Sequence, residues 1–493
     1  MSIWLTMSPL LSLVVAGLVL MLLESFAREK VEPAMVAIVG LLVSGGLSLG
    51  LWISGATGAE VPLIISRYLD TGQTGLFFDI VICGGAAFSA MLAGGYLKEH
   101  GLERGDFYVV LLFSAFGAMV LARAVDLVSI FIGLETMSLG VYCLVAYRRS
   151  SSRSTEGAIK YFLLGSFAAA ILLFGSAFIY GATGHTDLAG IGEAIGGGNA
   201  DVTLVLLGLA LIIAGLAFKV SAVPFHMWTP DAYEGAVTPA TTFMAVVVKT
   251  AAFAVFARVL VTGFGDELSA NGQTGWPPVV AGLAAVTMIY GNLAAIVQTS
   301  VKRMLAYSSI AHAGYLLVGV AAVAEGGREA MSSVFFYLMA YTVSNALAFG
   351  SLILMGSRGK EAVTYEDLAG VGRRHPMAAL PFVVGVLSLM GFPPTAGFFA
   401  KYYVFNAAVQ VGGGMVWLAV LGILTSGIGA YYYLRVIVCM FMKEPQAGAV
   451  AAVPMRSGYV VVALVLSAYF VFKMGVTPGS YLEMALEAAA RLG

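Results

Sequence analysis

A run of about 20 apolar residues is long enough to cross the hydrocarbon core of a bilayer as a helix. Such runs recur along the whole 493-residue chain. Charged residues make up 11% of the sequence, whereas soluble domains average about 25%. We therefore predict an all-α polytopic membrane protein with fourteen transmembrane helices. The expected helices cover residues 8–25, 33–54, 74–97, 106–123, 127–147, 158–181, 202–225, 238–263, 278–298, 303–324, 330–356, 377–409, 414–441 and 457–475.

The polar segments between these runs are too short for a separate soluble domain, so a single membrane domain is expected over residues 1–493. The formal net charge of −1 gives no reason to expect nucleic acid as a partner. Cys83, Cys143 and Cys439 lie far apart in apolar segments, so neither a metal site nor a disulfide framework is expected. The glycine-rich segment 189–200 lacks the ending of a phosphate-binding loop and is expected to be a surface loop.

Lysines and arginines are distributed unevenly between the two sets of loops. Sixteen follow odd-numbered helices, and five follow even-numbered helices. Because cytoplasmic loops are enriched in Lys and Arg, the odd-numbered loops are expected in the cytoplasm and both termini on the other side. This alternation requires an even number of helices. The remaining five of the 26 basic residues fall inside the expected spans: Lys219, Lys249, Arg258, Lys401 and Arg435.

Two of these lysines lie on consecutive spans, in the stretch FKVSAVPFHMWTPDAYEGAVTPATTFMAVVVKT over residues 218–250. A lysine at the bilayer centre costs about 2.5–3.5 kcal/mol on insertion scales. We therefore interpret Lys219 and Lys249 as stations on a proton path. Pro224 removes a helical hydrogen bond to the carbonyl of Val220. The helix is expected to break one residue past Lys219, and a kink that serves packing alone is the alternative.

Glu135 lies about two turns into the fifth expected helix, within FIGLETMSLGVYCLVAYRR. A carboxylate in an apolar run needs a cation or a proton, and Lys219 is its natural partner. Burial disfavours the charged form of each group, so a proton can move when the pair opens. A permanent structural ion pair is the alternative.

The twelfth expected helix repeats the combination of proline and lysine. It reads LSLMGFPPTAGFFAKYYVF, with Pro393 and Pro394 in mid-span and Lys401 beyond them. The seventh and twelfth expected helices both have this combination and are separated by five places in the helix order. This spacing indicates two five-helix repeats, helices 4–8 and 9–13. Copies with an odd number of helices are inverted in the membrane, as in many transporters. The expected organisation is helices 1–3 in residues 1–105, the first repeat in 106–264, the second repeat in 276–442, and helix 14 with the C-terminus in 443–493.

The tenth expected helix carries a histidine, and it has no acid where Glu135 would fall in the repeat. His312 lies in KRMLAYSSIAHAGYLLVG, close to Ser308 and Ser309. A histidine can relay protons near neutral pH, and a hydrogen-bonded core histidine is an equally good interpretation. Tyrosines and phenylalanines scattered through the spans are expected to serve packing.

With these motifs in hand, the chain resembles a known family: the antiporter-like membrane subunits of respiratory complex I, the NADH:quinone oxidoreductase. These are similar in turn to subunits of multisubunit cation/proton antiporters. The resemblance covers nearly the whole chain. It rests on GLETMSLGVY, the lysine-containing stretch over 218–249, KRMLAYSSIAHAGYLLVG and GFPPTAGFFAKYYVF. A lysine rather than an acid at position 401 favours the subunit N branch of this family over its sister branches.

The resemblance implies a role for each charged residue in proton transfer. Glu135 and Lys219 match the ion pair of helices 5 and 7 in the family. Lys249 matches the connecting lysine of helix 8, and Lys401 matches the helix 12 lysine toward the periplasmic exit. His312 joins these four as a candidate.

The resemblance also implies the setting of the chain. The family couples quinone reduction, catalysed by other subunits, to proton translocation across the bacterial inner membrane. The expected partners are sister antiporter-like subunits, small membrane subunits and lipids. Flavin, iron–sulfur clusters and quinone would be held by partner subunits, and this chain would hold no cofactor.

Two other functions stay open at the level of the sequence. A subunit of a multisubunit cation/proton antiporter would share these motifs and would support sodium-dependent transport without NADH. A scaffold that no longer pumps is disfavoured, because all four charged stations are present.

Overall fold

The structure is a computed structural model that describes residues 3–26, 32–55, 63–198, 200–266, 268–271, 275–356, 359–445 and 453–490. Arg28, Lys30, Arg358 and Arg491, which entered the count of loop charges, lie outside these ranges. The helices are α1 Ile3–Phe26, α2 Pro33–Ile53, α3 Leu63–Ser66, α4 Gln73–Glu99, α5 Gly105–Arg123, α6 Leu127–Val145, α7 Ser152–Thr183, α8 Leu188–Gly196, α9 Val202–Val220, α10 Trp228–Gly235, α11 Thr238–Phe243, η1 Met244–Val248, α12 Lys249–Arg258, η2 Val259–Gly263, α13 Trp276–Ile296, α14 Val301–Leu354, α15 Tyr365–Leu368, α16 Val371–Arg374, α17 Pro376–Met390, α18 Ala396–Val411, η3 Gly413–Met415, α19 Val416–Met442, α20 Gly458–Val476 and α21 Pro478–Ala489.

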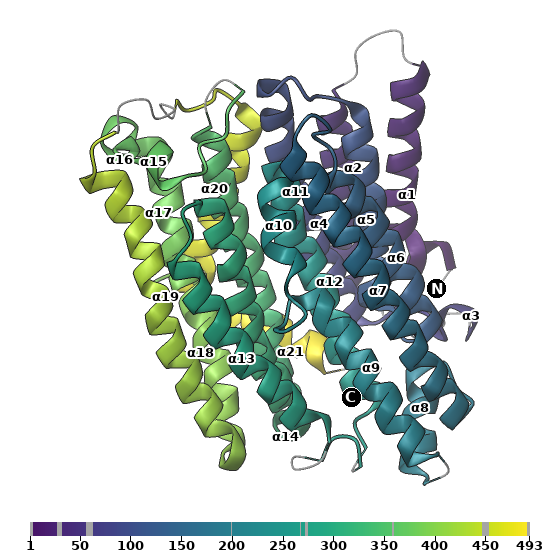
Figure 1. Cartoon of the computed structure of the whole chain (residues 1–493). Coiled ribbons are helices and arrows are strands. Elements are labelled where there is room, and N and C mark those ends of the chain that lie inside the picture. The colour runs from purple at the N-terminus through teal and green to yellow at the C-terminus, as the bar shows by residue number, and fades with distance from the viewer. Residues whose placement is uncertain are drawn as a thin grey trace.

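The helices form one bundle in which the long elements run roughly alongside one another (Figure 1). In the described ranges no β-sheet forms, and only three isolated bridges join extended residues. Within the part of the chain that the structure describes, twelve helical segments are long and apolar enough to cross a membrane. The prediction of an all-helical polytopic membrane protein is therefore confirmed.

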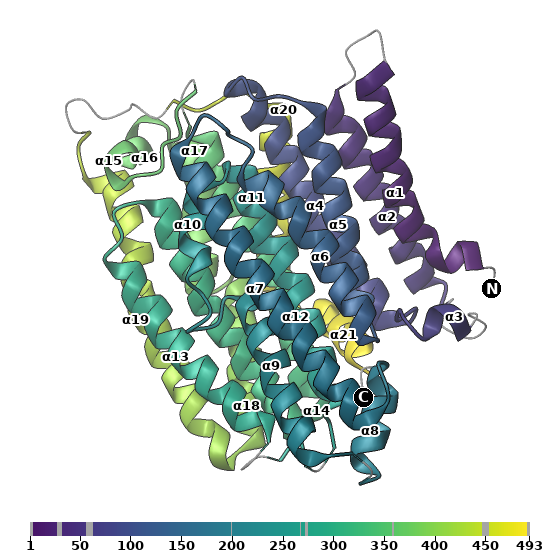
Figure 2. The same ribbon diagram turned by 45° about the vertical axis from the view of Figure 1, so that its right-hand side comes forward.

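Burial separates the centre of the bundle from its flanks. In α14, and in the continuous segment from α11 to η2, 94% of the apolar window is buried, against 33% in α1. α1 and α2 form one flank and α19 forms the opposite flank (Figure 2). Apolar side chains exposed on these flanks face the surroundings of the bundle, as expected where helices contact lipid or neighbouring membrane subunits.

The longest helix, α14, contains one non-helical residue. Gly327 has φ 51° and ψ −134°, a conformation that is nearly closed to residues with a Cβ atom. The polar sequence EGGR around it separated two of the expected spans, 303–324 and 330–356. The break falls where that sequence predicted a boundary, and the chain is helical both before and after it.

The two expected helices that combine a proline with a lysine are both interrupted close to their prolines. α9 ends at Val220, one residue past Lys219, so the expected span to residue 225 was five residues too long. α17 ends at Met390 and α18 begins at Ala396, with Pro393 and Pro394 in the gap. Each break brings backbone polar groups to membrane depth, where they are tolerated only inside protein or beside water.

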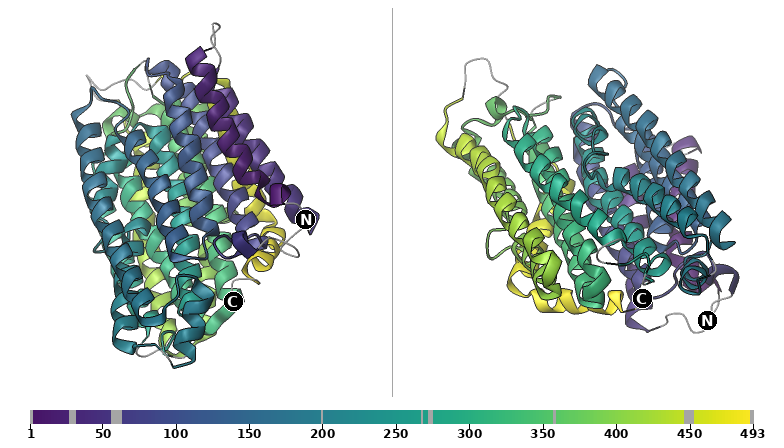
Figure 3. Two further views of the ribbon diagram at one scale, coloured as in Figure 1. Left: turned by 90° about the vertical axis from the view of Figure 1, so that its right-hand side faces the viewer. Right: turned by 60° about the horizontal axis from the view of Figure 1, so that its bottom comes forward.

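Two short helices were not predicted. The segment expected as a loop over 189–200 contains α8, because Asp187 caps it through the backbone N–H of Gly190 and its apolar residues pack against η2. α21 runs across the ends of the bundle instead of along it (Figure 3). It is held there by hydrogen bonds from Thr74 and Arg328 to two of its carbonyl oxygens.

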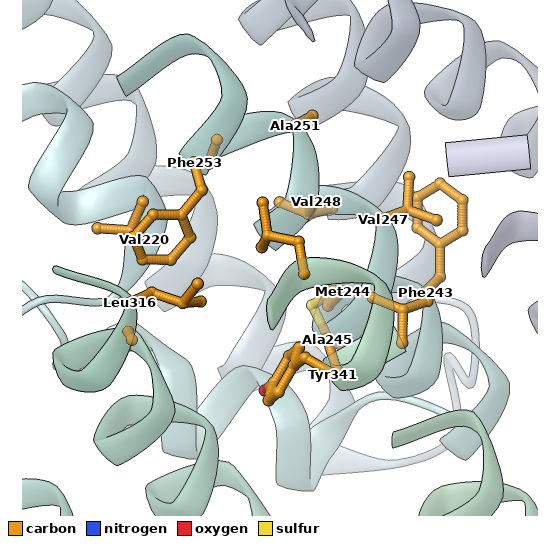
Figure 4. Close-up of a cluster of buried hydrophobic side chains, with 14 of the residues drawn as sticks. Val220, Phe243, Met244, Ala245, Val247, Val248, Ala251, Phe253, Leu316 and Tyr341 are labelled. Atoms are coloured by element: carbon orange, nitrogen blue, oxygen red, sulfur yellow. The ribbon is translucent and has the colours of Figure 1, made fainter. Parts of the chain in front are cut away.

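The core of the bundle surrounds the π-helix η1. Val220, Met244, Val248 and Phe253 are all at most 1% exposed and pack with Leu316 of α14 (Figure 4). A π-helical turn inside an α-helix is a local irregularity that occurs often at functional sites. Here it directly precedes Lys249.

Candidate functional site

Lys219 lies in the last turn of α9, with only 2% of its surface exposed. Its Nζ donates to the hydroxyl of Tyr161 at 3.4 Å. The ammonium also lies 5.0 Å from the centre of the Tyr161 ring and 5.5 Å from that of Tyr142. Aromatic faces attract cations, so these two rings provide part of the stabilisation that water would give the charge.

The break after Lys219 is closed by specific hydrogen bonds. Ser221 adopts a left-handed backbone with φ 66°, and its N–H and that of Ala222 return to the last turn of α9. Trp228 donates its indole N–H to the carbonyl oxygen of Phe218 at 2.9 Å. The indole then stacks on Tyr161, with ring centres 4.1 Å apart and planes 9° apart. The broken end of α9 thus fixes the aromatic residue that faces the lysine.

Glu135 is half-buried on α6 and does not contact Lys219 directly. No ion pair of 4 Å or less joins them among the described residues, and Oε1 of Glu135 is buried without a hydrogen-bond partner there. Tyr142 lies two turns further along α6 than Glu135, on the same side of that helix. Tyr142, on the Glu135 side of α6, therefore lies beside Lys219, and Glu135 and Lys219 lack the direct contact expected from the sequence.

Lys249 is the first residue of α12 and is 2% exposed. Its Nζ donates to both oxygens of Ser309 on α14, at 2.6 Å to the carbonyl and 2.5 Å to the hydroxyl. The same hydroxyl accepts from Tyr341 at 2.8 Å and lies 3.5 Å from the hydroxyl of Tyr233. The Ser309 hydroxyl therefore has three polar neighbours: Lys249 of α12, Tyr233 of α10 and Tyr341 of α14 itself.

His312 lies one turn beyond Ser309 on α14 and is 4% exposed. Its Nδ1 is 2.7 Å from the hydroxyl of Tyr337 and its Nε2 is 3.2 Å from the hydroxyl of Tyr433. Tyr433 is also hydrogen-bonded to Ser308. Both ring nitrogens have hydroxyl partners, each of which can donate or accept, so the histidine can exist in either neutral tautomer.

Lys401 lies on α18 and reaches back across the proline break. Its Nζ donates to the carbonyl oxygen of Met390 at 2.9 Å and to the hydroxyl of Ser426 at 2.7 Å. The ammonium lies 5.0 Å from the centre of the Tyr315 ring. Gly391, with φ 89°, turns the chain away after α17 and leaves that carbonyl open to the lysine.

One side of α14 connects these separate groups. Ser309, His312 and Tyr315 follow each other at intervals of three residues, so they line one side of the helix. Ser309 contacts Lys249, and Tyr315 contacts Lys401. The centres of the His312 and Tyr315 rings are 5.6 Å apart. We call Ser309, His312 and Tyr315 the polar stripe of α14.

Tyrosines beside these charged and polar side chains were expected to serve packing, and for five of them that expectation was wrong. Their hydroxyls contact the charged or titratable side chains, or the serine that joins them. The aromatic character of the residues gave no signal of this, because a tyrosine in an apolar run usually packs. Only Tyr315 had a positional signal, three residues after His312. These tyrosines are Tyr161, Tyr233, Tyr337, Tyr341 and Tyr433.

Glu361, in the segment between α14 and α15, was not singled out in the sequence. Its Oε1 accepts from the hydroxyls of Tyr96 at 2.8 Å and Thr238 at 2.5 Å, and Lys302 lies 3.6 Å from Oε2. Burial alone would raise the pKa of Glu361, but the ammonium of Lys302 and the two hydroxyl donors hold this pKa below its usual range. The carboxylate thereby joins the ends of α4, α11 and α14.

A second set of buried charges lies at the opposite ends of these helices. Arg123 and Asp79 are both fully buried and form an ion pair between α5 and α4. Arg258 of α12 pairs with Asp70 at 2.8 Å. Each cation has an anion beside it, which compensates part of the cost of burying the two charges. In the part of the chain that the structure describes, no three His, Cys, Asp or Glu side chains gather as metal ligands would.

Comparison with known proteins places this geometry in a family. The family model described as "NADH:quinone oxidoreductase/Mrp antiporter, TM" matches residues 124–429. The NADH-quinone oxidoreductase subunit N 1 of Sorangium cellulosum is 55% identical over 502 aligned residues, which cover 98% of each chain. The subunit N of Granulibacter bethesdensis is 41% identical over 99% of this chain and 100% of its own.

Solved structures agree with these relatives. A chain of respiratory complex I from Thermus thermophilus, solved with bound Aureothin, has a TM-score of 0.78 and is 34% identical. That match covers 96% of this chain and 98% of the other. A chain of the Mrp complex from Dietzia sp. DQ12-45-1b has a TM-score of 0.83 at 21% identity, with coverage of 99% and 97%, and shares the fold. The chain therefore belongs to the subunit N family of NADH-quinone oxidoreductases, within the wider NADH:quinone oxidoreductase/Mrp antiporter transmembrane family.

Proposed function

We propose that this chain is the antiporter-like membrane subunit of a proton-translocating NADH:quinone oxidoreductase. It would act as a non-redox subunit of this translocase and move protons through buried Glu, Lys and His side chains. The observation that carries the proposal is the polar stripe of α14, which lies against Lys249 at one end and Lys401 at the other. Charged side chains inside membrane helices are costly and mark ion pathways.

The proposed topology has fourteen crossings. In this count α14 contributes two, divided at Gly327, and α17 with α18 contributes one broken crossing. Crossings 4–8 and 9–13 form inverted repeats, with the broken helices in equivalent places. Both termini lie on the periplasmic side of a bacterial inner membrane. The corresponding ranges are 1–105 for crossings 1–3, 106–264 and 276–442 for the repeats, and 443–493 for crossing 14 with the C-terminus.

The proposed mechanism begins at Glu135 and Lys219. A change that arrives from the site of quinone reduction weakens the attraction between their charges, and the lysine then holds its proton less tightly. The proton moves by way of Lys249 and along the polar stripe toward Lys401, from which it leaves. Hydroxyl groups suit each step because they donate and accept at the same atom.

The proposed partners follow from the names of the relatives. Sister antiporter-like subunits, small membrane subunits and lipids would surround the exposed apolar flanks. Flavin, iron–sulfur clusters and quinone would belong to partner subunits. The relatives carry the name of complex I subunit N over nearly their whole length, and this favours complex I over a multisubunit cation/proton antiporter.

The test replaces Lys219 with alanine in the assembled complex. NADH-driven proton translocation should fall sharply, while NADH oxidation by an artificial acceptor that bypasses quinone should stay near the wild-type rate. The control is Lys443→Ala, since this lysine is exposed at the end of α19. Unimpaired translocation by the Lys219 variant would contradict the proposal and favour a scaffold. Purification with small membrane subunits only, and sodium-dependent transport without NADH, would favour the antiporter.

A further inference from the structure

The hydroxyl of Ser309 has more neighbours than its hydrogen-bonding capacity allows in a single arrangement. A serine hydroxyl has one hydrogen and two acceptor positions. Lys249 Nζ lies 2.5 Å from it, Tyr341 donates to it from 2.8 Å, and Tyr233 lies 3.5 Å away. When Lys249 is charged it only donates, so the lysine and Tyr341 fill both acceptor positions. Among the described neighbours of this hydroxyl, Tyr233 then remains as the acceptor for the serine hydrogen.

Loss of the proton from Lys249 changes this arrangement. A neutral amine carries a lone pair that can accept, and among the described residues Nζ is hydrogen-bonded to the carbonyl oxygen and the hydroxyl of Ser309. A carbonyl oxygen cannot donate, so the serine hydrogen must turn to the lysine. The acceptor position that the lysine leaves is then open to Tyr233. The direction of the hydrogen bond between Ser309 and Tyr233 therefore reverses with the charge of Lys249.

Tyr233 connects this reversal to the neighbourhood of Lys219. It lies on α10, the short helix that follows the break in α9, and its ring centre is 6.3 Å from that of Trp228. Trp228 stacks on Tyr161, whose hydroxyl accepts from Lys219. Tyr233 is fully buried, and its backbone carbonyl oxygen accepts from the hydroxyl of Thr241 at 2.9 Å, which fixes the backbone of α10 at this residue.

We infer that Ser309 is a positioning residue whose hydroxyl couples the charge of Lys249 to Tyr233, and through α10 to the surroundings of Lys219. The inference rests on the proposed function and adds a group to its path. Energetic coupling between two sites acts equally in both directions. Charge at Lys219 therefore also influences how tightly Lys249 holds its proton.

The test uses a double-mutant cycle in the assembled complex. Ser309→Ala removes the hydroxyl but keeps the backbone carbonyl that anchors Lys249, and Tyr233→Phe removes only one oxygen. Each variant should slow NADH-driven proton translocation by about tenfold, within the range of typical coupling between sites. The double variant should be no slower than either single variant, because both remove the same link.

The matched control is Ser351→Ala. Ser351 is a buried serine of the same helix whose hydroxyl donates to the carbonyl oxygen of Leu347, one turn back in that helix. This variant should stay within about twofold of wild type, since one such bond contributes little net stability. Ser309→Thr, which keeps a hydroxyl, should restore most of the rate. The amount of assembled complex and its NADH oxidation with an artificial acceptor measure folding separately.

Three results would overturn the inference while leaving the proposed function intact. One is wild-type translocation in Ser309→Ala while Lys219→Ala is impaired. Another is a defect in Ser309→Ala that Tyr233→Phe does not share. The third is a double variant as slow as the product of the two single effects, which would show independent contributions. If Lys219→Ala and Ser309→Ala both pump at the wild-type rate, the proposed function itself fails.

Discussion

The ammonium of Lys401 lies 2.9 Å from the carbonyl oxygen of Met390, the last residue of α17. The last carbonyls of a helix lack partners within that helix, and this end carries the negative part of the helix dipole. A cation from one half of the broken helix thus stabilises the exposed end of the other half. Lys401 is therefore a structural residue of the break as well as a candidate for proton transfer.

These two roles can be separated by comparing Lys401→Gln with Lys401→Met. Glutamine keeps an N–H donor for Met390, whereas methionine leaves that carbonyl without one. We expect both variants to lose proton translocation, since both lose the titratable group. The glutamine variant should be more stable by about 1–2 kcal/mol, the cost of an unsatisfied buried acceptor. Thermal unfolding and NADH-driven translocation check this, and a glutamine variant that pumps normally would contradict the functional role.

We expect the buried charge of Lys219 to lower the free energy of unfolding, although the proposed proton transfer depends on it. Among the described residues, the Lys219 ammonium makes one hydrogen bond, 3.4 Å long, and has no direct contact with Glu135. Replacing a buried ion pair with apolar groups of similar volume is often neutral or stabilising by about 1–4 kcal/mol, whereas removing one partner of a contacting pair costs about 3–5 kcal/mol. Because Lys219 has no contacting carboxylate, its replacement leaves no such partner behind. We expect Lys219→Met to unfold at the same or a higher temperature while proton translocation is lost.

Lys443→Met provides the comparison, because an exposed lysine should change the free energy of unfolding by less than about 0.5 kcal/mol. A Lys219→Met variant that is clearly less stable than this control would identify Lys219 as part of a stabilising pair. That result would support the structural interpretation of the lysine instead.

Gly327 should be required at the break of α14. A Cβ atom there would meet no neighbour within 4 Å, so only the backbone conformation resists substitution. Holding alanine at φ 51° and ψ −134° costs roughly 1–3 kcal/mol. We expect Gly327→Ala to lower the free energy of unfolding by this amount. In Gly282→Ala, within α13 and equally uncrowded, alanine should be neutral or stabilising by up to about 1 kcal/mol. If the two substitutions changed the free energy of unfolding equally, the backbone conformation of Gly327 would not be what resists alanine.

Glu361 should make stability depend on pH in acid. Its pKa is lowered in the folded protein, because Lys302, Thr238 and Tyr96 outweigh the effect of burial. A lowered pKa means that the carboxylate contributes full stability above its unfolded pKa of about 4.3, and that this contribution is lost as the pH falls through the folded value. We expect Glu361→Gln to destabilise the protein by on the order of 2 kcal/mol near pH 7. Because this variant has no carboxylate to protonate at position 361, its stability should also fall less than that of the wild type as the pH is lowered.

The measurement for Glu361 is the unfolding temperature of the detergent-purified protein between roughly pH 3 and pH 7, which brackets the titration. Glu366→Gln, an exposed change in the neighbouring helix α15, serves as the control and should show little effect at any pH. If Glu361→Gln has the wild-type dependence on pH, the joint between α4, α11 and α14 does not depend on this carboxylate.

The sequence predicted those parts of the bundle that depend on neighbouring residues in the chain. Apolar runs of membrane-spanning length marked the long helices, and Pro224 marked the end of α9. Apolar run length did not predict α8 and α21. These short helices at the ends of the bundle contain no long apolar run and depend on caps and tertiary contacts. Hydrogen bonds from distant side chains, such as that of Thr74 to α21, cannot be read from spacing.

The charged residues of the candidate site stood out for a similar reason, since a lysine or histidine in an apolar run is conspicuous. The structure brings Lys249, His312 and Lys401 to one side of α14, which no local pattern could establish. It also assigns hydroxyl partners that the sequence could not identify, among them Tyr233 and Tyr341. The distance between Glu135 and Lys219 depends on how α6 and α9 pack, and the sequence contains no direct record of that packing.

The polar stripe of α14 can conduct protons only if Lys249 joins it to the rest of the path. The direct measurement is the rate of NADH-driven proton uptake into vesicles that contain the assembled complex with Lys249→Ala, at matched NADH oxidation by an artificial acceptor. We expect proton uptake to fall by at least about tenfold, as for loss of a group that transfers protons. Uptake at the wild-type rate would show that protons cross this protein by another route or do not cross it at all.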